Sequence, residues 1–207
     1  MVRIKDRMKK IAFFACLLAL CAAAASAQES RQDISLSGTA LIEPFVESSS
    51  DVQVHATPAY GALLSYRFMM TPTAALEANY GITYENSIGL SRIPNSYKVL
   101  TRTQEMSGAF VKSFVFRNWN PFVEAGPAGL IFLPILNSGT TTYSTKQQTE
   151  VGALYGGGFA YEISPSFDIR AEYRGVVAKV PNMGITDFAV NRWYNISEPV
   201  VGVAYHF

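Results

Sequence analysis

The sequence predicts an all-β fold, an eight-stranded antiparallel up-and-down barrel that crosses a membrane. Three observations predict it: strands that alternate apolar and polar side chains, connections that alternate in length, and an export signal at the N-terminus. The alternation is clearest at 167–175, where Phe167, Ile169, Ala171 and Tyr173 share one parity and the positions between them carry four charges. Because strand side chains repeat every two residues, one face of this strand is apolar and the other is charged.

Two kinds of barrel are compatible with such a strand. A soluble barrel of lipocalin type turns its apolar face inward, whereas a membrane barrel turns that face to lipid and encloses the charges. Strand parity alone does not separate them. Charged residues, Gly or Pro interrupt every later apolar run, so a membrane-bound chain would have to cross as a closed barrel. Aromatic residues at the two rims favour the membrane barrel, namely Tyr60 and Tyr84 at one rim and Phe68, Tyr161, Phe167 and Phe207 at the other.

The N-terminal residues predict export. Five basic residues in the first ten positions precede an apolar core at 11–21 and an Ala-Ser-Ala cleavage site at 25–27. We therefore predict a signal peptide at 1–27 and a barrel domain at 28–207. Both cysteines lie in this signal, so we expect neither disulfides nor thiolate metal sites in the exported chain. The exported chain has 12 basic and 15 acidic residues, a net charge of −3. Proteins that bind nucleic acids usually carry a basic surface, so this charge argues against that function.

Eight strands and seven connections account for the exported chain. We expect strands at 33–42, 58–68, 76–84, 103–116, 121–133, 149–163, 167–177 and 193–207. We expect long polar loops at 44–56, 85–102, 134–148 and 179–191, and short turns at 69–73, 117–120 and 164–166. Outer-membrane barrels have short periplasmic turns and long extracellular loops. The three short turns and both chain ends would therefore lie on the periplasmic side.

The first four strands are assigned by the apolar residues on one parity. For the first three, the outward residues are Ile34, Leu36, Ile42, Tyr60, Leu64, Tyr66, Phe68, Leu76, Tyr80, Ile82 and Tyr84. A turn proline, Pro72, separates the second strand from the third. The fourth strand is ambiguous, because enclosing Glu105 turns Lys112 to lipid, while the opposite parity encloses Lys112 and exposes Glu105. A β-bulge would resolve this conflict, and the register stays open.

The last four strands follow the same rule. The fifth encloses Glu124 between the outward Val123 and Ala125, and the sixth encloses Glu162 next to the outward Tyr161. A Ser-Pro-Ser turn leads into the seventh strand, described above. The eighth strand ends with Val201, Val203, Tyr205 and Phe207 on one parity.

This C-terminal strand resembles the assembly signal of bacterial outer-membrane proteins. Tyr205 and Phe207 end the chain in the pattern by which such proteins are handed to the barrel-assembly machinery. Together with the export signal and the strand count, the chain resembles the small, porin-like outer-membrane barrels of the OmpA and OmpX type. The resemblance implies a monomer in the outer membrane of a Gram-negative bacterium, in contact with the lipid bilayer and lipopolysaccharide.

Charged residues on the inward parity form the main candidate site. An eight-stranded barrel is just wide enough for side chains to fill, and buried charges have to pair. We expect a salt-bridged plug centred on Arg170, Glu172 and Arg174. The alternative is a narrow gated pore, in which the excess of carboxylates would favour cations. The expected interior charges are Asp33, Arg67, Glu77, Glu124, Glu162, Asp168, Arg170, Glu172, Arg174 and Glu198.

Other motifs give no chemical site. The glycine triplet at 156–158 lies within a strand and lacks a phosphate-loop lysine, so it indicates curvature or space for a neighbour. His55 and His206 are expected almost a strand length apart and cannot share a metal. A catalytic arrangement of His55 with Asp51 and a serine of 48–50 has no fixed geometry. We therefore expect no catalytic, cofactor-binding or metal-binding residues.

The expected function is that of an integral outer-membrane barrel with a structural or surface-interaction role, and not that of an enzyme. Long loops on a rigid scaffold are the usual place for binding. The first loop is acidic through Glu47 and Asp51, and the second is basic and aromatic through Arg92, Tyr97, Lys98 and Arg102. The alternative function is a narrow, porin-like channel for passive transport of small ions or solutes.

Overall fold

The computed structural model describes residues 31–47, 52–84, 86–92, 95–135, 146–182 and 192–207. The predicted signal peptide at 1–27 lies outside these residues and stays a prediction. Eleven β-strands in the described part belong to a single sheet. The described part contains no helix that could span a membrane.

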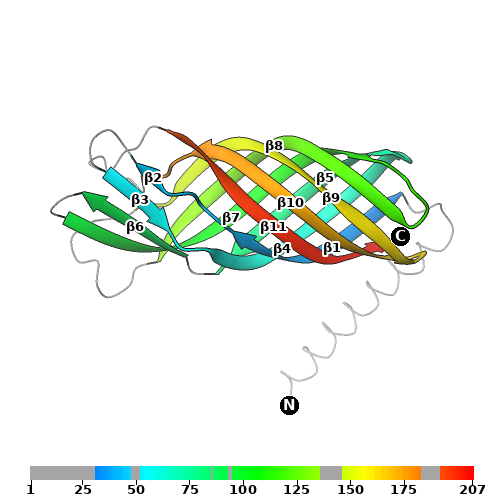
Figure 1. The fold of residues 1–207 in the computed structure, drawn as a ribbon, viewed down its shortest axis with the longest axis horizontal. Helices are drawn as coiled ribbons and strands as arrows, with labels where there is room; N and C mark the ends of the chain where they lie inside the picture. Colours follow the sequence, from blue (N-terminus) through cyan, green and yellow to red (C-terminus); the bar gives the residue numbers. More distant parts are fainter. Residues whose placement is uncertain (1–30, 48–51, 85, 93–94, 136–145, 183–191) are drawn as a thin grey trace, which may run out of the picture.

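Eight of the strands close into an antiparallel barrel (Figure 1). They are β1 (Gln32–Leu41), β4 (Ala59–Thr71), β5 (Ala74–Thr83), β7 (Asn95–Ser113), β8 (Trp119–Ile135), β9 (Gln148–Ser164), β10 (Phe167–Lys179) and β11 (Trp193–His206). Each pairs with the next barrel strand along the chain, and pairing of β1 with β11 closes the cylinder. The predicted eight-stranded up-and-down barrel is confirmed.

The two ends of the barrel differ. At one end, which we call the turn end, short connections join β4 to β5, β7 to β8 and β9 to β10. Asp33 pairs there with His206, so the barrel's first and last strands begin and end side by side (Figure 1). We call the opposite end the loop end, and strands β2, β3 and β6 project from it (Figure 1).

Two of the expected polar loops contain strands, so those assignments are wrong. The segment 44–56 forms β2 (Val46–Glu47) and β3 (Val52–Ala56), and the segment 85–102 forms β6 (Asn86–Arg92) and the first part of β7. β3 continues into β4 after a break at Thr57 and Pro58, where the proline has no N–H to donate. Thr57 and Ser87 bridge this break, through the Thr57 N–H to the Ser87 carbonyl and the Ser87 N–H to Thr57 Oγ1, both 3.1 Å. Val52, Val54 and Ala56 alternate as in a strand, but the serines and prolines nearby are typical of a loop and favoured that assignment.

The register of the fourth barrel strand needs no bulge between β5 and β7. Their pairing runs without a shift from Ala74 and Lys112 to Ile82 and Gln104. Glu105 is buried on the inward parity, and Lys112 is exposed on the outward one. Lys112 lies at the turn end, where its Nζ donates to Thr73 Oγ1 at 2.7 Å. A long cationic side chain at a rim can keep its charge in the polar interface, which removes the conflict.

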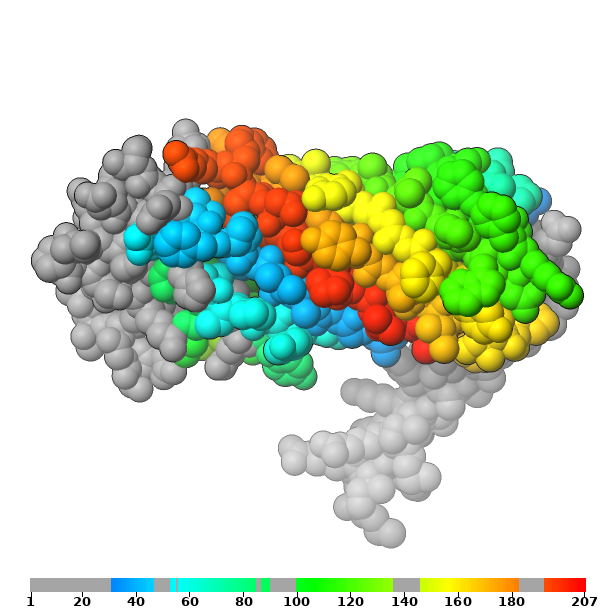
Figure 2. All heavy atoms as spheres, viewed as in Figure 1, coloured from blue at the N-terminus to red at the C-terminus, as the bar shows by residue number. Residues whose placement is uncertain are grey.

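The outer wall of the barrel is apolar. Leu36, Tyr60, Val151 and Val201 are each more than half exposed, as are several other outward side chains. Side chains of β1, β11, β10 and β9 form a continuous wall of diagonal bands (Figure 2). A soluble protein does not expose an apolar surface of this extent, so the outward parity is the lipid-facing one and the lipocalin alternative is excluded.

The interior divides into a polar part and an apolar part. Charged side chains lie in the middle and at the turn end, where buried apolar residues such as Val111 and Phe122 accompany them, whereas the loop end is packed with buried apolar side chains. The buried charged residues therefore lie at the turn end and in the middle of the barrel. The buried apolar residues near the loop end include Leu41, Leu130, Phe132, Leu154, Val176 and Ile196, together with Val54 and Ile88 from the projecting strands.

Candidate functional site

A first cluster of charges lies at the turn end. Arg170 on β10 donates from Nη1 and Nη2 to the two carboxylate oxygens of Asp33 on β1, at 2.9 and 2.8 Å. His206 on β11 lies between β1 and β10, with Nε2 2.8 Å from Asp168 Oδ2. Bidentate arginine–carboxylate pairs combine strength with fixed geometry. This cluster therefore ties the first strand of the barrel to the last two strands.

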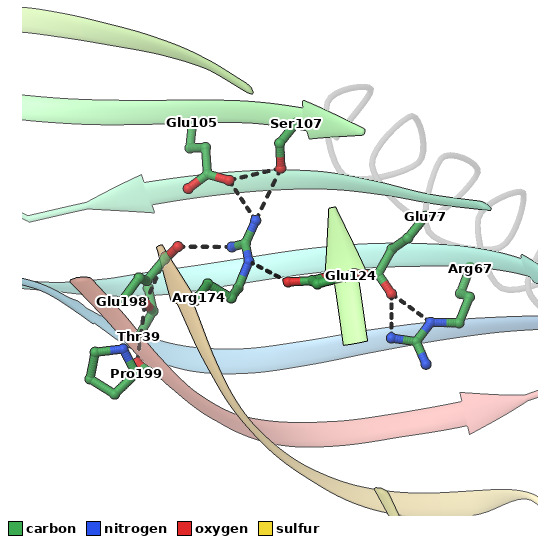
Figure 3. A network of polar contacts seen from close by, with 9 residues as sticks. All are labelled: Thr39, Arg67, Glu77, Glu105, Ser107, Glu124, Arg174, Glu198 and Pro199. Carbon is green, nitrogen blue, oxygen red and sulfur yellow. Dashed lines mark hydrogen bonds and ion pairs between the residues drawn. The ribbon is translucent and has the colours of Figure 1, made fainter. Parts of the chain in front are cut away.

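A second cluster surrounds Arg174 in the middle of the barrel (Figure 3). The Arg174 side chain is fully buried, and its Nη2 lies 2.6 Å from Glu105 on β7. Nη1 lies 2.9 Å from Glu198 on β11, and Nε lies 3.3 Å from Glu124 on β8. In the strand order, β7 and β11 are directly opposite each other around the barrel. One guanidinium thus links opposite walls across the lumen.

Two hydroxyl groups orient the carboxylates of this cluster. Thr39 Oγ1 donates to Glu198 Oε1 at 2.8 Å, and Ser107 Oγ donates to Glu105 Oε1 at 2.8 Å. Ser107 Oγ also accepts a hydrogen bond of 3.0 Å from Arg174 Nη2. Three carboxylates share one arginine, whose single positive charge balances them only in part. The two hydroxyl donors add stabilisation to Glu198 and Glu105.

A further ion pair joins neighbouring strands. Arg67 on β4 and Glu77 on β5 are direct cross-strand partners, and their charged atoms lie 2.5 Å apart. The Arg67 guanidinium also lies 4.8 Å from the centroid of the Phe122 ring, within the range of a cation–π contact. Both side chains are buried. The pair lies beside the Arg174 cluster, on the side of Glu124 (Figure 3).

The glycine triplet makes room for this charged interior. A Cβ on Gly156 would lie 2.7 Å from Glu124 Oε1, and one on Gly158 would lie 2.6 Å from the Glu172 Cβ. These distances are shorter than side chains tolerate, so the two inward glycines leave space for acids on the neighbouring strands. The triplet lies within β9, as expected.

The sequence-predicted interior charges are only partly brought together. Arg67 and Glu77 pair, Arg174 holds Glu124 and Glu198, Arg170 holds Asp33, and Asp168 pairs with His206. Glu172 and Glu162 are half-buried, and neither forms an ion pair within 4 Å with another described residue. The plug is therefore centred on Arg174, and not on a contiguous set that includes Glu172.

Sequence reasoning missed Glu105 and the role of His206. The sequence leaves the position of Glu105 undecided because the register of its strand is open. Its parity is shared by Thr101 and Thr103, whose hydroxyl groups are a weak sign of an inward face. The sequence pattern gives no partner for His206, which lies 2.8 Å from Asp168 in the structure. Its pairing with Asp33 across β1 and β11 follows from closing the barrel, which local sequence does not report.

Several expected loop residues cannot be placed. Ser48–50 and Asp51 lie outside the described residues, and the side chains of Glu47, His55, Arg92, Tyr97 and Lys98 do too. The suggested catalytic arrangement with His55 therefore stays untested. Among the described residues, no group of three or more His, Cys, Asp or Glu side chains could hold a metal ion.

A small cavity separates the Arg174 cluster from the apolar loop end. It has a volume of about 10 Å³ and is lined in part by Thr39, Thr83, Thr103, Glu105 and Glu198. A cavity of this size holds at most about one water molecule. Beyond it, the buried apolar side chains begin. The lumen is thus filled by side chains at three levels: the turn-end cluster, the Arg174 cluster and the apolar loop end.

One acid lies at the loop end, between β1 and β2. Burial raises the pKa of Glu43 from 4.5 to about 7, and the nearby Tyr194 hydroxyl opposes part of this rise. Glu43 is therefore partly protonated near neutral pH, unlike an exposed glutamate.

Aromatic side chains ring the outer surface at the turn end. Tyr205 stacks with Phe207, with 6.1 Å between the ring centroids, and packs at a tilt against Phe167, with 5.1 Å between the centroids. Trp119 and Tyr161 form another pair at 4.9 Å. The two residues of the expected assembly signal thus belong to an interfacial girdle, as expected. Their role in assembly stays a prediction.

Comparisons with known proteins agree with this geometry. A family model described as the outer membrane protein beta-barrel domain matches residues 12–207. Neisserial surface protein A is similar, with a TM-score of 0.59, 15% identity and coverage of 86% of this chain and 98% of that protein. The outer membrane protein OprG from Pseudomonas aeruginosa has a TM-score of 0.62, 12% identity and coverage of 87% and 97%.

A third structure, the attachment invasion locus protein Ail of Yersinia pestis, has a TM-score of 0.50, 14% identity and coverage of 87% and 100%. At these identities the likeness concerns the fold. The comparison with curated proteins finds no match.

Proposed function

The chain belongs to the outer membrane protein beta-barrel domain family, and from this we propose that it acts as a sealed scaffold that holds an interaction surface outside the cell. Membership places it in the bacterial outer membrane, with its apolar wall against the lipid bilayer. Barrels of this kind have short turns in the periplasm and long connections outside. The turn end is then periplasmic and the loop end extracellular.

The Arg174 cluster carries the proposal of a sealed lumen. Arg174 joins β10 to Glu105 and Glu198 on opposite walls, and the side chains involved are almost completely buried. Breaking a buried ion pair by removing one partner leaves an uncompensated charge and is strongly destabilising. Opening the lumen at the Arg174 cluster would require breaking these buried ion pairs. The apolar packing beyond the cluster adds a second barrier to ions.

The projecting strands support a role in surface interaction. β2, β3, β6 and the first part of β7 extend the barrel wall beyond its loop end (Figure 1). This platform is held by continuous backbone pairing and not only by loops. Rigid scaffolds commonly present binding residues in this way. The basic and aromatic residues at 92–102 would suit a partner with negative charge.

The remaining partner assignments belong to the same proposal. We infer that the protein works as a monomer without catalysis, contacts lipopolysaccharide around its rim and is inserted by the barrel-assembly machinery. Every barrel strand pairs with two neighbouring strands of the same chain, which supports a monomer. The terminal aromatic pair of Tyr205 and Phe207 supports insertion by that machinery.

Single-channel conductance in planar bilayers tests the sealed scaffold. We expect the inserted parent to be silent, and the double variant Arg170→Ala, Arg174→Ala to be silent as well if it inserts, because the apolar packing at the loop end remains. Arg170→Ala alone should stay silent, since the Arg174 level remains. Discrete cation-selective steps in the parent would instead support the narrow channel, whose physical basis is the excess of interior carboxylates over arginines.

A further inference from the structure

We propose that a groove on the outer wall of the barrel, near its extracellular rim, binds the phosphorylated glycolipid of the outer leaflet. The groove has a volume of about 270 Å³ and is lined by Ala62, Ile82, Thr83, Tyr84 and Arg102. These residues come from β4, from the end of β5 and from β7. The inference rests on the extracellular orientation proposed above and names a site for one of the partners proposed there.

An offset between strands creates the groove. Ile82 on β5 pairs with Gln104 on β7, and Asn86 on β6 pairs with Thr101. The chain advances four residues from β5 into β6 while β7 advances three, so one extra residue lies opposite β7 at this point. Such a bulge interrupts the ladder and increases the local twist. On the other side, Tyr84 keeps its backbone hydrogen bond to Tyr60, so the opening faces β7.

The lining has the character of an amphiphile site. Ala62 and Ile82 are outward apolar side chains, and Arg102 is an exposed cation at the edge of the same groove. Arg102 forms no ion pair or hydrogen bond with another residue in the described part of the chain. Lys179, another outward cation at the loop end, lies over the Trp193 ring at 5.8 Å. Among the described residues the Arg102 guanidinium therefore has no partner, and such a group can bind phosphate oxygens in a bidentate manner.

The depth of Arg102 matches the phosphate level of the outer leaflet. Arg102 and Lys112 lie on the outward parity of one strand, ten residues apart. At about 3.3 Å per residue and a tilt of about 40°, this separation is about 25 Å along the barrel axis, the height of the apolar band. Lys112 lies at the periplasmic rim, where it bonds to Thr73. Arg102 therefore lies at the opposite boundary, where acyl chains meet charged headgroups.

A phosphorylated glycolipid fits this combination best. Its phosphate would bind Arg102, and an acyl chain would lie over Ala62 and Ile82 in the adjoining part of the groove. A free phosphate ion would use only the arginine and gain nothing from the apolar lining. The outer leaflet of this membrane is rich in such glycolipids, so the site would be occupied by the lipid that surrounds it.

Native mass spectrometry of the detergent-solubilised protein tests the site, with purified bisphosphorylated lipid A as the probe. Arg102→Gln should weaken binding about fivefold, the effect expected for one cation near a charged lipid surface. Lys112→Gln, on the same strand at the other rim, should leave binding unchanged. Ala62→Trp should weaken binding by filling the groove, whereas Ala153→Trp, an outward alanine on β9, should not. Circular dichroism confirms that each variant keeps its strands.

The outcomes separate the possibilities. Unchanged binding in Arg102→Gln, or an equal loss in Lys112→Gln, would overturn the site, and if Arg102→Gln does not fold, the two tryptophan variants decide. Equal binding of phosphatidylglycerol would overturn the assignment to a glycolipid, and displacement by inorganic phosphate would overturn the role of the acyl chain. None of these variants alters the interior, so loss of the lipid site would leave the conductance result for the sealed scaffold unchanged.

Discussion

Arg174 and Glu105 form a 2.6 Å ion pair that joins β10 to β7 across the barrel lumen. The two residues are 69 positions apart in the chain, and their strands are not neighbours in the sheet. Backbone pairing holds each strand only to its neighbours. This contact, together with that of Arg174 to Glu198, therefore braces the cylinder from within against flattening.

Replacing Arg174 with methionine should destabilise the barrel by about 3–5 kcal/mol, because three carboxylates would lose their shared cation. Equilibrium urea unfolding in detergent, followed by strand circular dichroism, measures this. The double variant with Glu105→Gln should recover part of the loss, since one uncompensated charge is removed. If Arg174→Met unfolds at the same urea concentration as the parent, the central role of Arg174 is wrong.

Replacing Leu64 with arginine should cost about 2–4 kcal/mol, because its outward side chain faces the middle of the lipid band. Val151→Arg is the depth control. Val151 lies near the loop-end boundary, where the expected cost is only about 0–1 kcal/mol. Unfolding from lipid vesicles provides the comparison. Equal stabilities for the two variants would contradict the assigned membrane depth.

Glu43 should make the barrel less stable as the pH rises. Its pKa is about 7 in the folded protein and 4.5 in the reference state, so the folded protein holds a proton that the unfolded chain releases. The stability associated with this proton is fully present below about pH 4.5 and is lost as the pH rises through about 7. We therefore expect Glu43→Gln to gain stability relative to the parent between pH 5 and pH 8. A constant difference between the two proteins over this range would argue against the burial of Glu43.

Deleting Phe207 should lower the amount of assembled protein in the outer membrane, since the residue completes the terminal aromatic pattern with Tyr205. Quantitative blotting of outer-membrane fractions measures the effect. Phe159→Ala is a matched control, because it removes an aromatic residue of the outer wall away from the terminus. Normal levels of the deletion variant would mean that the chain end is no assembly signal.

Local pattern predicted most of the fold. The outward parity of Ile34, Tyr60 and Tyr173 was readable because alternation in a strand depends only on adjacent residues. The same rule could not settle the fourth strand, where Glu105 and Lys112 have conflicting parities. That conflict disappears once depth is known, since Lys112 lies at a rim and Glu105 in the middle. Depth depends on how neighbouring strands are aligned, and that alignment is not local.

The candidate site was predictable in composition but not in arrangement. The ion pair between Arg67 and Glu77 was predictable, because a tight turn joins their two strands and sets the register between them. The partners of Arg174 could not, because Glu105, Glu124 and Glu198 lie on strands whose mutual position depends on closure of the whole barrel. The free space that decides which acid reaches the arginine also depends on Gly156 in a further strand.

The sequence by itself determined the number of barrel strands, the outward faces of all but the fourth, and the candidate interior charges other than Glu105, because these follow from a two-residue period and from the spacing of turns. Only the tertiary structure decided that Arg174 holds three acids, that Glu172 holds no ion-pair partner among the described residues, and that β3 and β6 extend the wall where loops were expected. The physical reason is that side-chain direction is a local property of a strand, whereas contact across a lumen depends on the stagger of all eight strands when the cylinder closes.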